Sequence, residues 1–263
     1  MTQTYQSLEI ERTGAVATIW MNRPEVCNAF DETLIADLTD VCVAMDADPS
    51  VRVVVLAGRG RHFSAGADLT WMQRASTSSH SENLEDARRF AKMLRSLADL
   101  SKPTIARVQG LALGGGTGLV AACDMAVASS DAAFSTSEVR FGIIPSVISP
   151  YVLRAIGARQ ALRYFQSAER ISAARAQAIG LVHEVHPADQ IDAAIATLVQ
   201  ALLAGAPKAQ HAAKELIRAV GGHPIDALLI EETARRIAHQ RTTPEARSGI
   251  GAFLAKSTPA WAL

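Results

Sequence analysis

A glycine-rich run in the middle of the chain is the first feature that suggests chemistry. Residues 110–118 hold five glycines, and the stretch Leu113-Gly114-Gly115-Gly116-Thr117-Gly118 lies between a predicted strand and a predicted helix. Glycines let a backbone approach a ligand closely, and the free N–H groups of a first helical turn point toward developing negative charge. The run does not fit the dinucleotide fingerprint G-x-G-x-x-G, because Leu119 stands where the last glycine belongs. It indicates either a site for a phosphate or an oxyanion, or a tight turn that packs a helix onto a strand.

A second run of small residues precedes another predicted helix. It consists of Phe63-Ser64-Ala65-Gly66-Ala67-Asp68-Leu69, in which Asp68 is placed to cap the helix or to complement its dipole. Alone, this segment is typical of an ordinary helix N-terminus. Together, two such turns can bring two backbone N–H groups to one point, which is the geometry of an oxyanion hole.

Glu138 is the candidate acid–base residue. It follows the small polar run Phe134-Ser135-Thr136 and precedes the apolar turn Phe141-Gly142-Ile143-Ile144-Pro145. A carboxyl group beside a pocket with little water has a raised pKa and suits proton transfer. The alternative is a surface glutamate that pairs with Arg140.

The elements that must position these residues alternate between strand and helix in the first half of the chain, which favours an α/β fold. Predicted strands span residues 8–11, 15–20, 51–56, 104–108 and 124–128, and predicted helices begin after Asp31 and span 82–100 and 119–123. Residues 76–81 are polar, and we expect them to form a mobile connection.

Beyond residue 150 the pattern becomes helical. Predicted helices span residues 151–156, 158–167, 173–179, 191–203, 208–220, 224–240 and 244–255, with one strand at 181–185. A shift near residue 200 predicts a core of residues 1–200 and a helical C-terminal module of residues 201–263. In the alternative interpretation, the last helices pack on the same core.

Composition excludes several classes of protein. Lysine and arginine total 26, and aspartate and glutamate also total 26, so the formal net charge is zero. Binding to nucleic acid or to an anionic membrane needs a basic excess, so neither partner is expected. No apolar stretch approaches the roughly 20 residues that span a bilayer, and the first residues lack a signal-peptide pattern. Three cysteines and seven histidines show no metal-ligand spacing, so we expect no metal and a cytoplasmic location.

Taken in order, these segments and several others resemble the crotonase (enoyl-CoA hydratase/isomerase) superfamily along essentially the whole chain. The resemblance rests on residues 22–30, 63–69, 108–110, 114–116, 123–124, 138–145, 168–170, 178–182 and 253–256. It implies an α/β crotonase-like spiral of ββα units with a C-terminal helical trimerisation module, assembled as a trimer or a dimer of trimers. It also implies an acyl-CoA substrate and no cofactor beyond the coenzyme A of that substrate.

The resemblance further implies roles for single residues. The backbone N–H groups of Ala67 and Gly115 would hold the thioester oxygen, and Glu138 would be catalytic. The bound coenzyme A would lie along Ala65, Gly66, Asp68, Leu69 and Gly114, with Val26 near its adenine, while Phe253 and Lys256 would reach the coenzyme A of a neighbouring subunit.

One position departs from the family pattern. Hydratases of the family usually carry two glutamates, and the first of them falls on Gly118. A single carboxylate favours a Δ3,Δ2-enoyl-CoA isomerase, in which one base moves a proton between C2 and C4. Against that, residues 137–140, 144–151 and 258–261 resemble the hydratases of 3-methylglutaconyl-CoA and carboxygeranoyl-CoA, which also carry glycine at that position.

The sequence therefore predicts an enoyl-CoA hydratase, a hydro-lyase, whose 2-enoyl-CoA substrate can be branched or carboxylated. An isomerase and a non-catalytic acyl-CoA-binding or RNA-binding homologue are the alternatives. Arg140 meets a substrate carboxylate, pairs with Glu138 or faces solvent. Trp71 and Met72 either line the acyl pocket or belong to a helix core.

Overall fold

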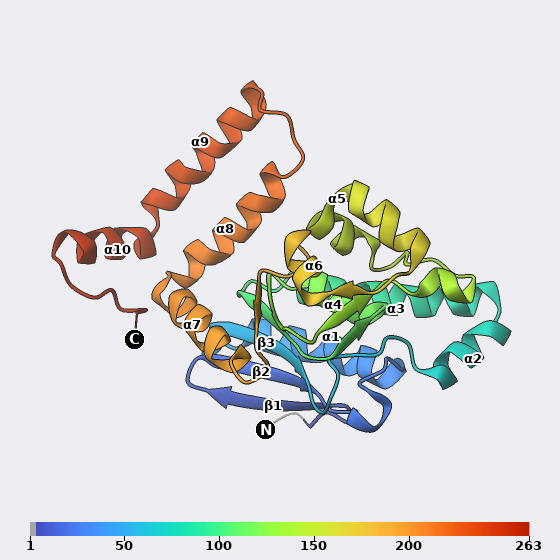
Figure 1. Cartoon of the computed structure of the whole chain (residues 1–263). Helices are drawn as coiled ribbons and strands as arrows, with labels where there is room; N and C mark the ends of the chain where they lie inside the picture. The colour runs from blue at the N-terminus through green and yellow to red at the C-terminus, as the bar shows by residue number, and fades with distance from the viewer. Residues whose placement is uncertain (1–3, 263) are drawn as a thin grey trace.

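The computed structural model describes residues 4–262, and their architecture is the α/β fold expected from the sequence (Figure 1). Six strands form one sheet in the order β1-β2-β3-β4-β6-β9. They are β1 Leu8–Thr13, β2 Val16–Met21, β3 Val53–Gly58, β4 Thr104–Val108, β6 Met125–Ser129 and β9 Glu184–His186. β1 and β2 form the predicted antiparallel hairpin, and from β2 onward each neighbouring pair of strands is parallel.

Both faces of this sheet are covered. In β3, Val54 and Leu56 belong to the main core, whereas Val53 and Val55 belong to a second apolar cluster, because successive side chains of a strand point to opposite faces. The main core is covered by α1 Glu32–Ala47, α3 His80–Ala98 and α4 Gly115–Ala122, and the second cluster by α7 Ile191–Ala204. A strand buried on both faces explains the nearly continuous apolar run at residues 51–56.

The predicted cap and apolar stripe of the first helix are confirmed. Asp31 is the N-cap of α1, and its side chain accepts a hydrogen bond from Leu34 N at 2.8 Å. The apolar positions that repeat at helical spacing are all buried in the main core: Leu34, Ile35, Leu38, Val41, Cys42 and Met45.

A small second sheet positions the candidate chemistry, and the sequence analysis missed it. Its strands are β5 Leu111–Leu113, β7 Ala133–Ser135 and β8 Ile171–Ser172. β5 leads directly into the glycine-rich start of α4, and β7 leads into η2, a short 3₁₀ helix spanning Glu138–Phe141. Strands of two or three residues are too short to show an alternating pattern, which explains the omission.

The expected connection at residues 76–81 is short, because α2 Leu69–Thr77 extends into it and Ser79 caps α3 in a reciprocal capping box with Glu82. The two helices predicted at residues 151–156 and 158–167 are confirmed as the two halves of α5 Ser149–Ser167, which is kinked at Gly157 with a φ of 73°. The short helix α6 Ala173–Ala178 lies where it was predicted.

The last three helices extend away from the sheet (Figure 1). They are α8 Pro207–Val220, α9 Ala227–Thr242 and α10 Pro244–Leu254, and none of them contains a buried residue. By contrast, Ile191, Ile195 and Val199 of α7 are buried on the sheet. The domain boundary at residue 200 and the oligomerisation role of the last helices stay predictions.

Two properties of the described chain bear on its partners. Among residues 4–262, no single helix is long and apolar enough to cross a membrane, and α7 with α8 meets that criterion only as a pair bent by 103°. Within the same residues, no group of three or more His, Cys, Asp or Glu side chains is arranged to hold a metal ion.

Candidate active site

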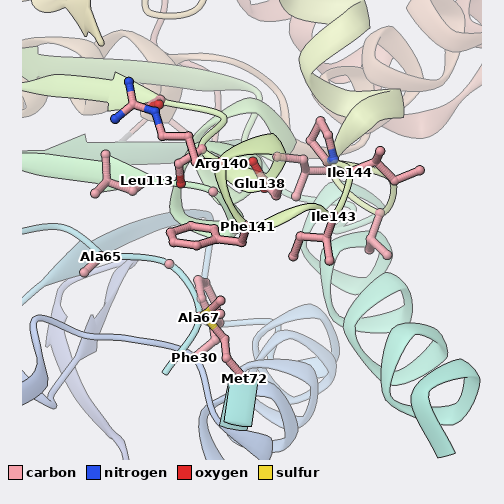
Figure 2. A pocket seen from close by; sticks show the side chains of 18 of the residues that line it. Phe30, Ala65, Ala67, Met72, Leu113, Glu138, Arg140, Phe141, Ile143 and Ile144 are labelled. Atoms are coloured by element: carbon pink, nitrogen blue, oxygen red, sulfur yellow. The ribbon is translucent and has the colours of Figure 1, made fainter. Parts of the chain in front are cut away.

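One cavity of about 540 Å³ gathers most of the residues that the sequence singled out. Figure 2 shows Phe30, Ala65, Ala67 and Met72 on one side of it and Glu138, Arg140, Phe141, Ile143 and Ile144 on the other. The remaining lining residues include Gly66, Leu69, Trp71, Phe90, Leu113, Gly114, Gly115, Ser135, Ser137, Ile148 and Arg170.

Ala67 contributes a free backbone N–H to this cavity. An isolated parallel bridge joins it to Phe30. Phe30 N donates to Gly66 O at 2.7 Å, and Asp68 N donates to Phe30 O at 2.9 Å, so the Ala67 N–H itself has no partner among residues 4–262. Gly66 has a φ of 91°, and a Cβ there would lie 2.9 Å from Leu113 O, so the sharp turn before Ala67 requires glycine.

Gly115 contributes a second free N–H from the opposite element. It is the first residue of α4, whose opening N–H groups have no acceptor within the helix. Gly114 N donates to Ser135 O at 2.8 Å, which ties the start of α4 to strand β7. No acceptor for Gly115 N is present among the described residues. The first residues of α4, at the glycine-rich run, therefore line the cavity.

Glu138 faces the same helix N-terminus. A Cβ on Gly114 would lie 3.2 Å from Glu138 Oε1, so the carboxyl group is next to the glycine-rich turn. Its Oε2 is buried, with no hydrogen-bond partner in the part of the chain that the structure describes. Burial raises the pKa of this carboxyl above its ordinary value. Glu138 forms no ion pair with Arg140, and it is not the exposed, paired glutamate of the alternative interpretation.

Comparison with known proteins identifies the family. The profile of the enoyl-CoA hydratase/isomerase family matches residues 11–262. The chain belongs to this family.

Three relatives illustrate how closely the chain follows the family. An enoyl-CoA hydratase structure from Shewanella pealeana is 37% identical, has a TM-score of 0.95 and matches 97% of this chain and 96% of its own. A Legionella pneumophila structure assigned to the enoyl-CoA hydratase/isomerase (crotonase) group is 44% identical, with a TM-score of 0.92 and coverages of 97% and 98%. The 2,3-dehydroadipyl-CoA hydratase of Escherichia coli is 33% identical over 253 residues, which are 96% of this chain and 97% of the relative.

The space beside Gly118 is filled by a neighbouring side chain. A Cβ on Gly118 would lie 2.3 Å from Cγ2 and 2.8 Å from Cβ of Ile148, a residue that lines the cavity just before α5. Ile148 is only 2% exposed, so a larger residue at position 118 would require it to move. Among the described lining residues, Glu138 carries the only carboxyl group.

The residues that the family resemblance assigned to coenzyme A are only partly brought together. Ala65, Gly66, Leu69 and Gly114 line the cavity. Asp68 does not line it; its carboxylate caps α2 by accepting from Thr70 N at 2.8 Å and Trp71 N at 3.3 Å, and it pairs with Arg23 at 3.4 Å.

Three further assigned residues lie outside the cavity. Val26 is at the end of η1, a 3₁₀ helix spanning Pro24–Val26, and is 37% exposed. Phe253 and Lys256 lie at the far end of α10, which Figure 1 shows on the side of the molecule opposite to α2. A single chain therefore does not bring these two residues to its own cavity.

The structure also reveals lining residues that the sequence analysis missed. Phe30 and Phe90 pack with ring centroids 5.4 Å apart, and Trp71 packs edge-on against Phe90 at 6.4 Å. Trp71 and Met72 line the cavity, and Trp71 also packs against the main core, so both interpretations hold for Trp71. Phe90 packs against the main core from α3, so the helical periodicity contained a signal for it. Arg170 is the last residue of segment 168–170, which the family resemblance already included.

Proposed function

We propose that this protein is an enoyl-CoA hydratase, which adds water across the C2=C3 bond of a 2-enoyl-CoA. The observation that carries the proposal is the placement of one buried, unpartnered carboxyl group, Glu138, in the same cavity as the free N–H groups of Ala67 and Gly115. Family membership and a relative named as an enoyl-CoA hydratase structure at 37% identity support it.

The two N–H groups serve as the oxyanion hole of the proposed reaction. When a nucleophile adds at C3, the conjugated thioester becomes an enolate, and negative charge gathers on the thioester oxygen. Preorganised N–H donors stabilise that charge, and the loss of one donor typically costs about 3–4 kcal/mol. Because neither N–H has an acceptor among residues 4–262, no hydrogen bond within that part of the chain has to break before the substrate binds.

Glu138 carries both proton transfers in this proposal. The ionised carboxylate accepts a proton from a water molecule while the water oxygen forms a bond to C3. The electron pair of the C2=C3 bond moves into the enolate, which then takes the proton back from Glu138 at C2. One water is consumed, and no electron donor, acceptor or metal is required by this balance.

The remaining family assignments form part of the proposal. Ala65, Gly66, Leu69 and Gly114 would border the coenzyme A moiety, with Asp68 fixing the start of α2 beside it. Val26 would lie near the adenine, and Phe253 and Lys256 would come from a neighbouring subunit of a trimer or a dimer of trimers. We place the enzyme in the cytoplasm and assign it no cofactor beyond the coenzyme A of the substrate.

We further propose that the acyl chain is branched or carboxylated, as in 3-methylglutaconyl-CoA. Two facts support this finer assignment. Residues 137–140 and 144–151 resemble hydratases of such substrates. The Escherichia coli relative is named for 2,3-dehydroadipyl-CoA, which is itself a carboxylated enoyl-CoA.

A second candidate function is a Δ3,Δ2-enoyl-CoA isomerase. It is favoured by one observation, the replacement of the first family glutamate by Gly118 with Ile148 packed against it. In that reaction Glu138 removes a proton from C2 and returns it to C4, so no water is consumed.

A product-resolved screen tests the proposal. The purified protein is incubated with straight-chain, branched and carboxylated 2-enoyl-CoAs, and with 3-enoyl-CoAs, while chromatography separates the products. We expect 3-hydroxyacyl-CoA from the 2-enoyl substrates. Formation of 2-enoyl-CoA from 3-enoyl-CoA as the dominant reaction would favour the isomerase, and no turnover of any thioester would refute both.

A further inference from the structure

We infer that Arg140 and Arg170 together recognise a carboxylate at the far end of the acyl chain. The inference rests on the proposed function, because it concerns the substrate of the same cavity. It goes further by assigning this substrate class to two guanidinium groups and by giving a role to Arg170, which lies in the family-like segment 168–170 but was assigned no role there.

The two arginines approach the cavity from adjacent elements. Arg140 lies in η2, two residues after Glu138. Arg170 immediately precedes β8, and the antiparallel register Phe134↔Ile171 places it opposite Ser135. Ser135 Oγ donates to Ala168 O at 3.2 Å, which holds the segment before Arg170 against β7. Both side chains therefore leave the backbone beside the segment from Ser135 to Glu138.

Charge in the cavity is unbalanced. Among its described lining residues, Glu138, Arg140 and Arg170 are the charged ones, and the others are apolar or neutral. Burial raises the pKa of Glu138, and no arginine contributes to the shift of its pKa. A carboxylate in close contact with a guanidinium would instead have a lowered pKa. The arginines are therefore not the counter-ions of Glu138.

Glu169, the acidic residue next to Arg170 in the sequence, is already paired with another arginine. Glu169 precedes Arg170, but its two oxygens accept from Arg163 Nε at 2.5 Å and Nη2 at 3.0 Å. Neither Arg140 nor Arg170 forms a side-chain hydrogen bond or an ion pair with any residue from 4 to 262. By comparison, Arg23 near the opposite side of the cavity is held by Asp31 at 2.9 Å and Asp68 at 3.4 Å.

Arg140 and Arg170 are exposed residues of the cavity lining, and their free guanidinium groups select for a planar anion. Arginine presents several N–H donors in a fixed fork that matches a carboxylate, and such charge-assisted pairs are stronger than neutral hydrogen bonds. An acyl chain that ends in a methyl group would leave both cations paired only with water. A chain that ends in a carboxylate would pair with them while its thioester lies at Ala67 and Gly115.

A matched pair of substrates tests this inference. Glutaconyl-CoA and 2-pentenoyl-CoA have five-carbon chains that differ mainly in whether the last carbon is a carboxylate or a methyl group. We expect Arg140→Gln and Arg170→Gln each to lower kcat/KM for glutaconyl-CoA by about 3- to 5-fold, the upper part of the range for an exposed ion pair. The same variants should change kcat/KM for 2-pentenoyl-CoA by less than about twofold.

Arg159→Gln is the control variant, because Arg159 is exposed on α5 outside the cavity. It should leave both substrates unchanged. Equal losses on both substrates in the Arg140 and Arg170 variants would mean that these groups bind the phosphates of coenzyme A, and this result would overturn the inference. No preference for glutaconyl-CoA in the unaltered enzyme would overturn it as well.

A binding measurement separates this inference from the proposed reaction. Glutaryl-CoA and pentanoyl-CoA are saturated and cannot be hydrated, so calorimetry gives their Kd whether or not the protein is a hydratase. We expect tighter binding of glutaryl-CoA and loss of that preference in both variants. Turnover of no enoyl-CoA together with this binding preference would refute the proposed function alone, whereas hydration without any carboxylate preference would refute the inference alone.

Discussion

The contact between Gly118 and Ile148 gives a quantitative prediction about the cavity wall. In Gly118→Ala, the new Cβ would lie 2.3 Å from Ile148 Cγ2 and 2.8 Å from Ile148 Cβ, far inside the 3.5–4.0 Å at which carbon atoms attract. α4 cannot easily move away, because a Cβ on Gly116, on the same helix, would lie 2.8 Å from Ser64 O. The side chain of Ile148 therefore has to move.

The expected cost follows from these distances. Overpacking a well-packed core typically costs about 1–3 kcal/mol, and replacing a helical glycine by alanine returns up to about 1 kcal/mol. We expect Gly118→Ala to lower the free energy of unfolding by about 1–2 kcal/mol. Ile148→Ala alone should cost about 2–5 kcal/mol, because it empties a buried site.

A double-mutant cycle then isolates the contact. Ile148→Ala removes Cγ2, so the alanine at position 118 meets only the remaining Cβ. The double variant should be at least about 1 kcal/mol more stable than the sum of the two single effects predicts. Ile148→Val is the matched control, because valine keeps the two atoms that collide and should give no coupling.

The assay is urea unfolding at one fixed protein concentration, since self-association would otherwise shift the apparent stability. Additivity within about 0.5 kcal/mol in the alanine cycle would refute the reasoning that Ile148 fills the site of the missing glutamate. So would an equal coupling in the valine control, because that coupling could not come from the Cγ2 contact.

Three further predictions concern the acid–base group and the oxyanion hole. Burial raises the pKa of Glu138, and the proposed reaction needs the ionised form of this carboxyl group. We therefore expect kcat/KM to fall toward low pH, with an apparent pKa above that of an ordinary glutamate. A pH profile of kcat/KM that stays flat would contradict this. A carboxyl group whose pKa is raised by folding stabilises the folded state while it is protonated, and this contribution is lost as the pH rises. Glu138→Gln should therefore be more stable than the unaltered protein at pH 8 but not at pH 4. Thermal unfolding at the two pH values measures the difference. In Gly115→Ala, the new Cβ would lie 2.7 Å from Phe90 Cζ, so α4 should shift and kcat fall by about 10²- to 10³-fold, whereas Gly251→Ala, which meets nothing within 4 Å, should keep full activity.

Features of the fold that depend on local sequence could be predicted. Asp31 caps α1 and Asp68 caps α2, because a short acidic side chain before a helical run satisfies free N–H groups wherever the helix later packs. The β-branched run at residues 51–56 predicted β3, since only a strand buried on both faces requires such a run. Gly157 likewise marked the break inside α5.

Features that depend on contacts between distant segments could not be predicted from the sequence. Ile148 lies thirty residues from Gly118 in sequence, and nothing in either local pattern shows that one fills the space of the other. Strand β7 has three residues and exists because it pairs with β5 and β8. The pairing of Arg163 with Glu169, which leaves Arg170 free, is also visible only once α5 has been placed.

In the proposed reaction, Glu138 delivers water to an enoyl thioester whose oxygen is held by two backbone N–H groups. The most direct test is turnover of a 2-enoyl-CoA in ¹⁸O-labelled water, with the mass of the product measured by mass spectrometry. We expect a 3-hydroxyacyl-CoA that carries one ¹⁸O atom, formed about 10²- to 10⁴-fold more slowly by Glu138→Gln. Product without ¹⁸O, or an unchanged rate in the Gln variant, would contradict it.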